Sequence, residues 1–327
     1  MDYPLSTVLH FLVPPACLWH SGGVSELTLA AALAFLFGLV IGSFLNVCIR
    51  RIPLGLSIVL PASRCPRCRT PIRPYDNIPV LSWVLLGGRC RACRAPISGV
   101  YPAVELLTGL LFAACVARFG LTLVAAKWAV FAALLIVLIF TDIFERILPD
   151  TVNFLGFAGG LAFSLAVPVG DGAAAWLARL AQAQLPERAL SLFDALLGAA
   201  LVSLPLWLFA VVFSRIIGRA AMGFGDVKMM VMVGSFLGLK QTFLTLLLGA
   251  VSGTVIGGLG VLVLFASGWK RDVAARAARR KLGSESVLRW TLARRYELPL
   301  GTFLGAAAIA VVFFGPAMLG WYAGLFR

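Results

Sequence analysis

The chain has 327 residues, of which 61% are hydrophobic and only 13% are charged. A soluble protein of this size could not bury so much apolar surface, so the composition excludes an ordinary soluble domain and indicates a membrane protein. The apolar runs are long and continuous, which predicts helical spans and not the short alternating strands of a β-barrel.

The net charge is +14, and Lys and Arg concentrate in two blocks, 50–94 and 270–295, with nine in each. Both blocks flank apolar runs, which is typical of cytoplasmic loops under the positive-inside rule. Neither block holds a recognisable nucleic-acid motif, so we expect contact with membrane lipids and no nucleic-acid partner. Residues 1–25 carry no Lys or Arg, which argues against a cleavable signal peptide.

The apolar runs predict an all-α polytopic membrane protein with about eight transmembrane helices. We expect these spans near 27–48, 103–118, 121–141, 151–168, 194–214, 227–239, 242–267 and 298–325. Three parts follow: an N-terminal segment with the first span (1–48), a cytoplasmic loop (49–102) and a transmembrane remainder (103–327). Alternating crossings place the stretch 169–193 outside.

Four of the seven cysteines form two Cys-x-x-Cys pairs with 21 residues between them: Cys65, Cys68, Cys90 and Cys93. Four thiolates at such a spacing suit a tetrahedral zinc ion, and a closed set of this kind is structural rather than catalytic. Two disulfides are the alternative, but thiols on the predicted cytoplasmic side are kept reduced. We expect no internal repeat in the chain.

Few side chains are available for chemistry. The only histidines, His10 and His20, precede the first span, which excludes a His-Glu-x-x-His metalloprotease and disfavours a Ser/His/Asp triad. The remaining candidates are carboxylates, and four of them cluster at the predicted cytoplasmic face: Asp142, Glu145, Asp150 and Asp226. Ionisable groups at membrane depth are costly, so their presence indicates a function.

Two of these carboxylates also have structural interpretations. Asp142 and Arg146 are four residues apart and could form a helical ion pair. Asp150 follows Pro149 and precedes an apolar run, so we expect it to be a helix N-cap.

Asp226 could likewise cap the helix that follows it. It stands after Gly223-Phe224-Gly225, however, and two glycines beside a carboxylate allow a substrate backbone to approach closely. Paired with Asp142, it would suffice for peptide hydrolysis. One of two close carboxylates keeps a proton and binds the scissile carbonyl, while the other takes a proton from water.

The motifs together resemble those of the bacterial prepilin peptidases, the type 4 prepilin-like leader peptidase/N-methyltransferases, which are membrane aspartic proteases of the GxGD type. The resemblance covers nearly the whole chain. It rests on both cysteine pairs and on segments at 42–47, 77–83, 101–109, 142–150 and 223–228.

This resemblance implies cleavage of type IV prepilins or type II secretion pseudopilins at the cytoplasmic face of the bacterial inner membrane. It assigns catalysis to Asp142 and Asp226, and an active-site loop to Gly223, Gly225 and Lys228. It also implies methylation of the new N-terminal amine by S-adenosylmethionine, linked to the region around 50–100. No Gly-rich nucleotide loop supports this second activity there.

Two segments depart from the family pattern. The basic loop 268–297 looks longer than usual, and Leu298-Pro-Leu-Gly-Thr302 replaces a commoner Ile-Pro-Phe-Gly-Pro. We expect the second to lie away from the aspartates. Asp76, Glu105 and Glu145 could meet basic residues of the leader, or could be ordinary solvated or capping groups.

Two other classes of function are weighed against the peptidase. One is a non-catalytic assembly protein, in which the cysteine loop docks a partner and the aspartates only cap helices. The other is a transporter, which would carry its charged residues near mid-membrane in broken helices. The carboxylates of this chain cluster at the ends of the spans instead.

Overall fold

The computed structural model describes residues 26–218, 223–266 and 299–325. These residues form helices and loops, with two isolated β-bridges and no strand among them, which confirms the predicted all-α fold. The elements are α2 (Glu26–Arg51), η1 (Ile52–Leu54), η2 (Pro74–Asn77), α3 (Leu81–Leu85), α4 (Val100–Phe119), α5 (Leu123–Glu145), α6 (Asp150–Ser164), α7 (Ala173–Leu180), α8 (Glu187–Ile217), α9 (Phe224–Ala266) and α12 (Leu300–Gly324). His10, His20 and the basic loop 268–297 lie outside the described residues.

Six described helices are long and apolar enough to cross a membrane: α2, α4, α5, α8, α9 and α12. The sequence predicts about eight spans, and two features account for the difference. With 15 residues, α6 is only about 22 Å long. The predicted spans 227–239 and 242–267 both fall within α9. The exact number of spans therefore stays a prediction.

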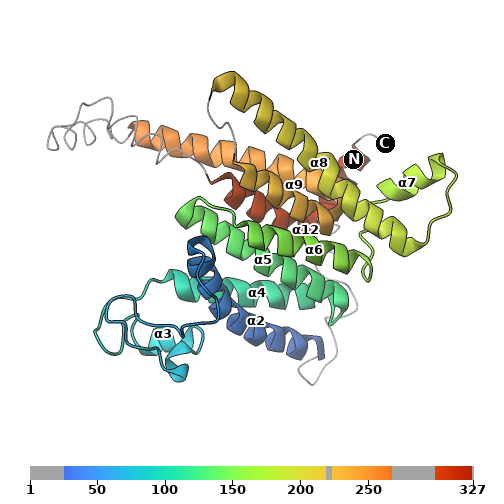
Figure 1. The fold of residues 1–327 in the computed structure, drawn as a ribbon. Coiled ribbons are helices and arrows are strands. Elements are labelled where there is room, and N and C mark those ends of the chain that lie inside the picture. Colours follow the sequence, from blue (N-terminus) through green and yellow to red (C-terminus); the bar gives the residue numbers. More distant parts are fainter. Residues whose placement is uncertain (1–25, 219–222, 267–298, 326–327) are drawn as a thin grey trace.

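The helix α9 reverses direction at Gly238, which has a backbone conformation of φ 75° and ψ −176°. Before this residue, α9 runs from Gly225, beside Leu148, to the level of Asp171. After it, the chain returns along α12, where Gly249 lies against Leu304 (Figure 1). The N–H of Lys240 donates to Asp171 Oδ1 at 2.9 Å, which caps the returning half. The two halves of α9 are thus antiparallel passes.

Replacing Gly238 by alanine is expected to destabilise the protein by about 1–3 kcal/mol, because only glycine adopts this conformation readily. A Cβ there would also lie 2.8 Å from Val169 Cγ1. The midpoint of thermal unfolding in detergent measures the loss. Gly258→Ala in the same helix is the control, since a Cβ there would meet no described atom within 4 Å. Equal midpoints for the two variants would contradict this account of the reversal.

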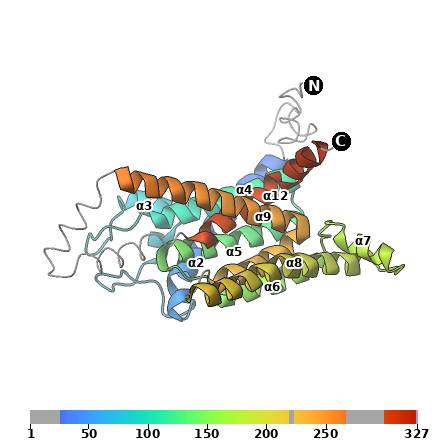
Figure 2. The ribbon, with the colours of Figure 1, turned by 90° about the horizontal axis from the view of Figure 1, so that it is seen from above.

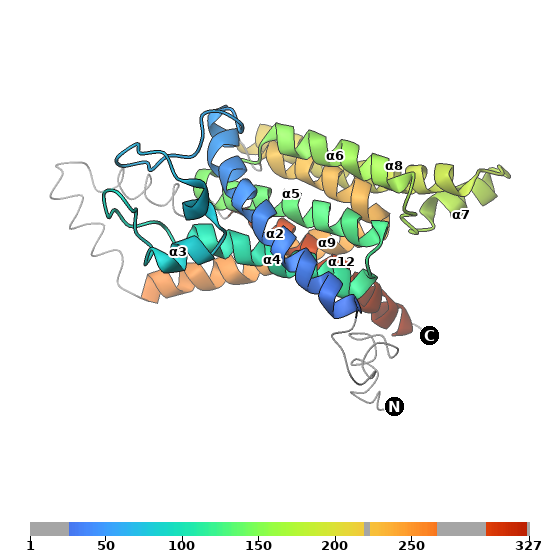
Figure 3. The same cartoon turned by 90° about the horizontal axis from the view of Figure 1, so that it is seen from below.

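In Figure 1 the helix α5 lies in the middle of the bundle, with α2 and α4 on one side and α6 and α12 on the other. Figure 2 shows the bundle from above, with α5 near its centre. The buried face of α5 is mostly apolar, with Lys127 as a buried exception, and Phe131 stacks on Phe236 of α9 with ring centroids 4.6 Å apart. The loop that carries α3 lies at one end of the bundle, and α7 lies at the opposite end (Figures 1 and 3). Asp142 is in the last turn of α5 and therefore lies near one end of the bundle.

Candidate active site and metal centre

Asp142 occupies the last turn of α5 and is only 7% exposed. The helix ends at Arg146, which takes a left-handed conformation (φ 58°) and donates its N–H to the carbonyl of Asp142. The Asp142 carboxylate faces the start of α12. Its Oδ2 accepts the backbone N–H of Thr302 at 2.8 Å and the Thr302 hydroxyl at 3.0 Å. One oxygen of Asp142 is therefore held by two donors of a single residue.

The expectation that the segment from Leu298 to Thr302 lies away from the aspartates is wrong. The helix α12 begins at Leu300, and its first turn packs directly against the end of α5. Gly301 permits this approach, because a Cβ there would lie 3.1 Å from Asp142 Oδ2. Thr302 is 160 positions from Asp142, and no periodicity or spacing in the sequence connects them.

Asp226 lies in the first turn of α9 and is 9% exposed. Its carboxylate is close enough to Asp142 for the charge of one to act on the other. Leu148 also ties the segments together. A Cβ on Gly225 would come within 3.0 Å of Leu148 Cβ, and a Cβ on Gly301 within 2.9 Å of Leu148 Cδ1. The ends of α5, α9 and α12 thus converge, with both aspartates at one end of the bundle.

The glycines before Asp226 differ in what surrounds them. Gly225 uses its missing side chain for packing within the protein, against Leu148. Gly223 lies beside the carboxylate itself, since a Cβ there would be 3.4 Å from Asp226 Oδ2. Among the described residues, nothing donates a hydrogen bond to that carboxylate.

Lys228 binds Asp150, with Nζ 2.6 Å from Oδ2, and so links the starts of α9 and α6. The prediction that Asp150 is an N-cap is wrong. Pro149 occupies the cap position, and Asp150 is the first residue of the helix with its side chain turned to Lys228. In the part of the chain that the structure describes, Asp142 forms no ion pair with Arg146. The interpretation of Asp142 as one half of a helical ion pair is therefore wrong.

The four cysteines of the two Cys-x-x-Cys pairs come together at one point of the loop. Their sulfur atoms all lie within 4.8 Å of one another, and those of Cys65 and Cys93 are 3.8 Å apart. A tetrahedral zinc with bonds of about 2.3 Å holds its sulfurs about 3.8 Å apart. All four thiols are free, so the structure contains no disulfide here. The cluster fits a metal ion.

The two cysteine pairs lie in matching loops, which corrects the expectation that the chain has no internal repeat. The segments 64–72 and 89–97 share the pattern Arg-Cys-x-x-Cys-Arg-x-Pro-Ile. In each, the first Cys N–H donates to the residue before proline, and an isolated bridge joins the Arg and Pro. Arg69 and Arg94 both take a positive φ, of 59° and 58°. The repeat was visible in the sequence and predicts a two-loop metal site.

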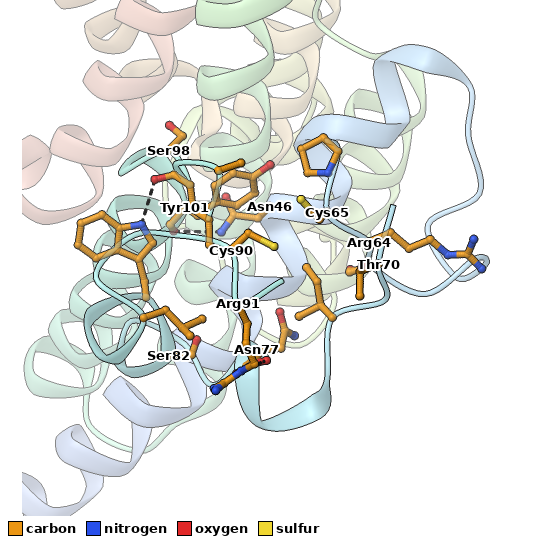
Figure 4. A pocket seen from close by; sticks show the side chains of 18 of the residues that line it. Asn46, Arg64, Cys65, Thr70, Asn77, Ser82, Cys90, Arg91, Ser98 and Tyr101 are labelled. Carbon is orange, nitrogen blue, oxygen red and sulfur yellow. Dashed lines mark hydrogen bonds and ion pairs between the residues drawn. The ribbon is translucent and has the colours of Figure 1, made fainter. Parts of the chain in front are cut away.

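A cavity of about 760 Å³ lies between this loop, the end of α2 and the start of α4. In Figure 4, Asn46 and Tyr101 from the two helices lie near Cys65 and Cys90 of the loop, whereas Arg64 extends away. Asn46 Nδ2 donates to the Tyr101 carbonyl at 3.1 Å. We call this the donor cavity, after the methyl donor that the family resemblance implies.

Two carboxylates that could meet a basic leader line the donor cavity, and both already have partners. Glu105 is 8% exposed, and its Oε2 accepts the N–H of Val80 at 2.7 Å. Asp76 forms a two-pronged ion pair with Arg91, at 2.6 Å in its shorter contact. These hydrogen bonds from Arg91 lower the pKa of Asp76. Glu105 therefore ties the loop to α4, whereas Asp76 and Arg91 join two parts of the loop to each other.

Comparison with known proteins gives matches over most of the chain. Residues 36–119 match the bacterial peptidase A24 N-terminal domain, and residues 129–258 match the type IV leader peptidase family. No solved structure gives a match.

Several relatives carry the name prepilin leader peptidase/N-methyltransferase. The Myxococcus xanthus protein is 42% identical over 73% of this chain, which spans 65% of that relative. The Aeromonas salmonicida protein is 33% identical over 71% of this chain and 81% of its own length. The Bacillus subtilis protein is 32% identical over 89% of this chain and 97% of its own length.

Proposed function

The chain belongs to the type IV leader peptidase family, and on this premise we propose that Asp142 and Asp226 are the catalytic pair of a membrane aspartic endopeptidase. The enzyme removes the leader from type IV prepilins or type II secretion pseudopilins, and it N-methylates the new N-terminal residue. The convergence of the two buried carboxylates at one end of the bundle carries the assignment of the catalytic pair.

The hydrogen bonds of Asp142 indicate which of the two acids is ionised and which carries the proton. Its Oδ2 accepts two hydrogen bonds from Thr302, and hydrogen bonds to a carboxylate favour its ionised form. Two carboxylates at close range share one proton, which we therefore place on Asp226. Asp142 takes a proton from water as the water oxygen attacks the scissile carbonyl. Asp226 hydrogen-bonds the carbonyl oxygen as negative charge develops, and the leaving amine then takes up the proton that Asp142 removed from water.

The active-site loop comprises Gly223, Gly225 and Lys228. Gly223 leaves room beside Asp226 for the substrate backbone, and Gly225 allows α9 to begin against Leu148. Lys228, paired with Asp150, holds α6 and α9 together at their starts. Gly223, Gly225 and the ion pair of Lys228 with Asp150 thus shape one rim of the site.

Thr302 is a positioning residue for Asp142, and losing its hydroxyl is expected to lower kcat for cleavage by about 10- to 100-fold. A hydrogen bond to a charged group contributes about 1.5–3 kcal/mol, and 1.4 kcal/mol corresponds to a factor of ten. Thr302→Val keeps the side-chain volume and the backbone donor, so KM should stay the same. Kinetics with a purified prepilin measure both constants.

Thr302→Ser should restore kcat, because serine supplies the same hydroxyl. Thr254→Val is the matched control, since the exposed Thr254 hydroxyl bonds only its own helix at the Ala250 carbonyl. Wild-type kcat in Thr302→Val, or an equal loss in Thr302→Ser, would remove Thr302 from the site.

The four cysteines Cys65, Cys68, Cys90 and Cys93 hold a structural Zn²⁺, and the closed set leaves no position open for substrate. The loop 49–102 and the active site face the cytoplasm, since the loop is rich in arginine. Its basic residues contact anionic lipids of the inner membrane, whereas 103–327 forms the peptidase domain.

S-adenosylmethionine fits the donor cavity, whose volume falls in the range of about 300–1,000 Å³ typical of ligand pockets. Trp83 and Tyr101 provide aromatic surface for the adenine and the sulfonium, and Glu105 is a buried carboxylate on the same wall. The bound molecule supplies an electrophilic methyl group. The residues of the cavity bind and orient it and limit the access of water.

Incubation of the purified protein with a prepilin, with and without S-adenosylmethionine, tests the function. The mass of the product reports leader removal and methyl addition separately. Intact prepilin in both reactions would favour the alternative of a non-catalytic assembly protein, in which the cysteine loop docks a partner.

A further inference from the structure

A second, smaller cavity of about 150 Å³ adjoins the donor cavity. Asn46, Arg50, Ser98 and Tyr101 line both cavities. The smaller cavity alone is also lined by three apolar residues from three helices: Ile49 of α2, Val100 of α4 and Phe144 of α5. The donor cavity thus continues toward the helix that carries Asp142.

Phe144 and Asp142 lie on opposite sides of that helix. Successive helical residues are about 100° apart, so two positions separate the side chains by about 200°. Asp142 faces α12, whereas Phe144 faces the cavity beside α2 and α4. The smaller cavity and the aspartates are therefore separated by about one helix diameter, roughly 10 Å, at the end of α5.

We propose that the smaller cavity is the acceptor site for N-methylation, which receives the first residue of the mature pilin after cleavage. This inference rests on the proposed function. Leader removal frees an amine beside the two aspartates, at the end of α5. The amine has only to pass around the end of α5 to reach the mouth of the donor cavity, while the apolar walls hold the first side chain.

The residues shared by the two cavities suit an amine that must react as a nucleophile. Asn46 is buried, and its Nδ2 donates a hydrogen bond to the Tyr101 carbonyl. Its Oδ1 is then the atom that can accept a hydrogen bond from an amine N–H. The Arg50 guanidinium on the same wall disfavours a second cation and so favours the neutral amine. In Figure 4, Asn46, Ser98 and Tyr101 lie together where the two helices meet the loop.

The transfer itself is a simple displacement. The amine lone pair forms a bond to the methyl carbon, and the carbon–sulfur bond breaks with its electrons going to sulfur. The sulfonium becomes the thioether of S-adenosylhomocysteine. The methylated nitrogen carries the positive charge and gives up one proton to solvent as the product leaves.

Filling the acceptor cavity should separate the two activities. Val100 lines this cavity and not the donor cavity, so Val100→Phe occupies the space of the incoming side chain. We expect wild-type leader cleavage, wild-type binding of S-adenosylmethionine by calorimetry, and at least a tenfold loss of methylation by mass spectrometry. The matched control is Val40→Phe, since Val40 is an exposed residue of α2.

The double variant Val100→Phe/Phe144→Ala restores the space and should regain methylation, which a folding defect would not allow. Normal methylation by Val100→Phe, or no recovery in the double variant, would overturn the acceptor site. A wild-type protein that cleaves but never methylates would instead refute the proposed second activity.

Discussion

Asp142→Asn and Asp226→Asn are each expected to reduce leader cleavage by roughly 10³-fold or more, because the loss of a general acid or base removes a proton transfer that nothing nearby replaces. Each change is isosteric and adds no charge at a buried position, so the helices should stay packed. Release of the leader, followed by mass spectrometry, measures the effect.

Asp150→Asn provides the matched control at the same end of the bundle. Its carboxylate is exposed and paired with Lys228, and its replacement should change cleavage by a few-fold at most. Both catalytic variants should still methylate a peptide that already carries the mature N-terminus. Folded, membrane-inserted variants that still process prepilin would disprove the assignment of the pair.

Replacing Cys65 or Cys90 by serine is expected to abolish zinc binding and unfold the loop. Binding of a structural zinc to four thiolates contributes about 10–16 kcal/mol to folding in small domains, and this loop has little apolar core of its own. Because the loop forms one wall of the donor cavity, binding of S-adenosylmethionine and methylation should be lost with it. Elemental analysis and limited proteolysis measure the metal and the fold.

Cys115→Ser is the control for this experiment, since Cys115 is buried in α4 away from the cluster. It should keep one zinc per chain and a protected loop. Purified wild-type protein that contains no zinc, or a Cys65→Ser loop as resistant to protease as the wild type, would contradict the structural metal.

Long apolar runs made the central helices predictable. The span expected near 121–141 is α5, and the one near 103–118 is α4. Boundaries were less predictable where polar turns extend a helix beyond its apolar run. The span expected near 194–214 begins at Glu187 in the structure, because Pro186 caps a helix whose first turns are polar.

The helix α7 was not predicted, because its support comes from another part of the chain. Its first turn is held by Asp194 of α8, which accepts the N–H groups of Gly172 at 3.2 Å and Ala174 at 2.7 Å. A cap supplied from about twenty residues away leaves no local pattern of the Ser-x-x-Glu kind. The apolar runs therefore predicted no helix in the stretch 169–193.

Some residues of the candidate site could be predicted from the sequence around them, whereas others depend on contacts between distant segments. Asp142 and Asp226 were found because family motifs surround them, whereas spacing alone left helix caps as alternatives. Thr302 was missed because its role depends on the packing of α12 against α5, which the linear sequence does not encode in any short pattern. The four-cysteine cluster was predictable from four residues, since both Cys-x-x-Cys pairs are local.

The short helices beside Asp226 have a consequence for the surrounding lipid. The 15 residues of α6 and the first pass of α9, residues 224–237, are each only about 21–22 Å long, against a hydrocarbon core of about 30 Å. They pack side by side, with Gly156 against Met232 and Gly160 against Ser235. The first pass of α9 is buried in the bundle, whereas α6 exposes Phe154 and Leu155, so the mismatch that lipid meets is that of α6. We expect the bilayer to be thinner beside α6, which would bring water closer to the carboxylates.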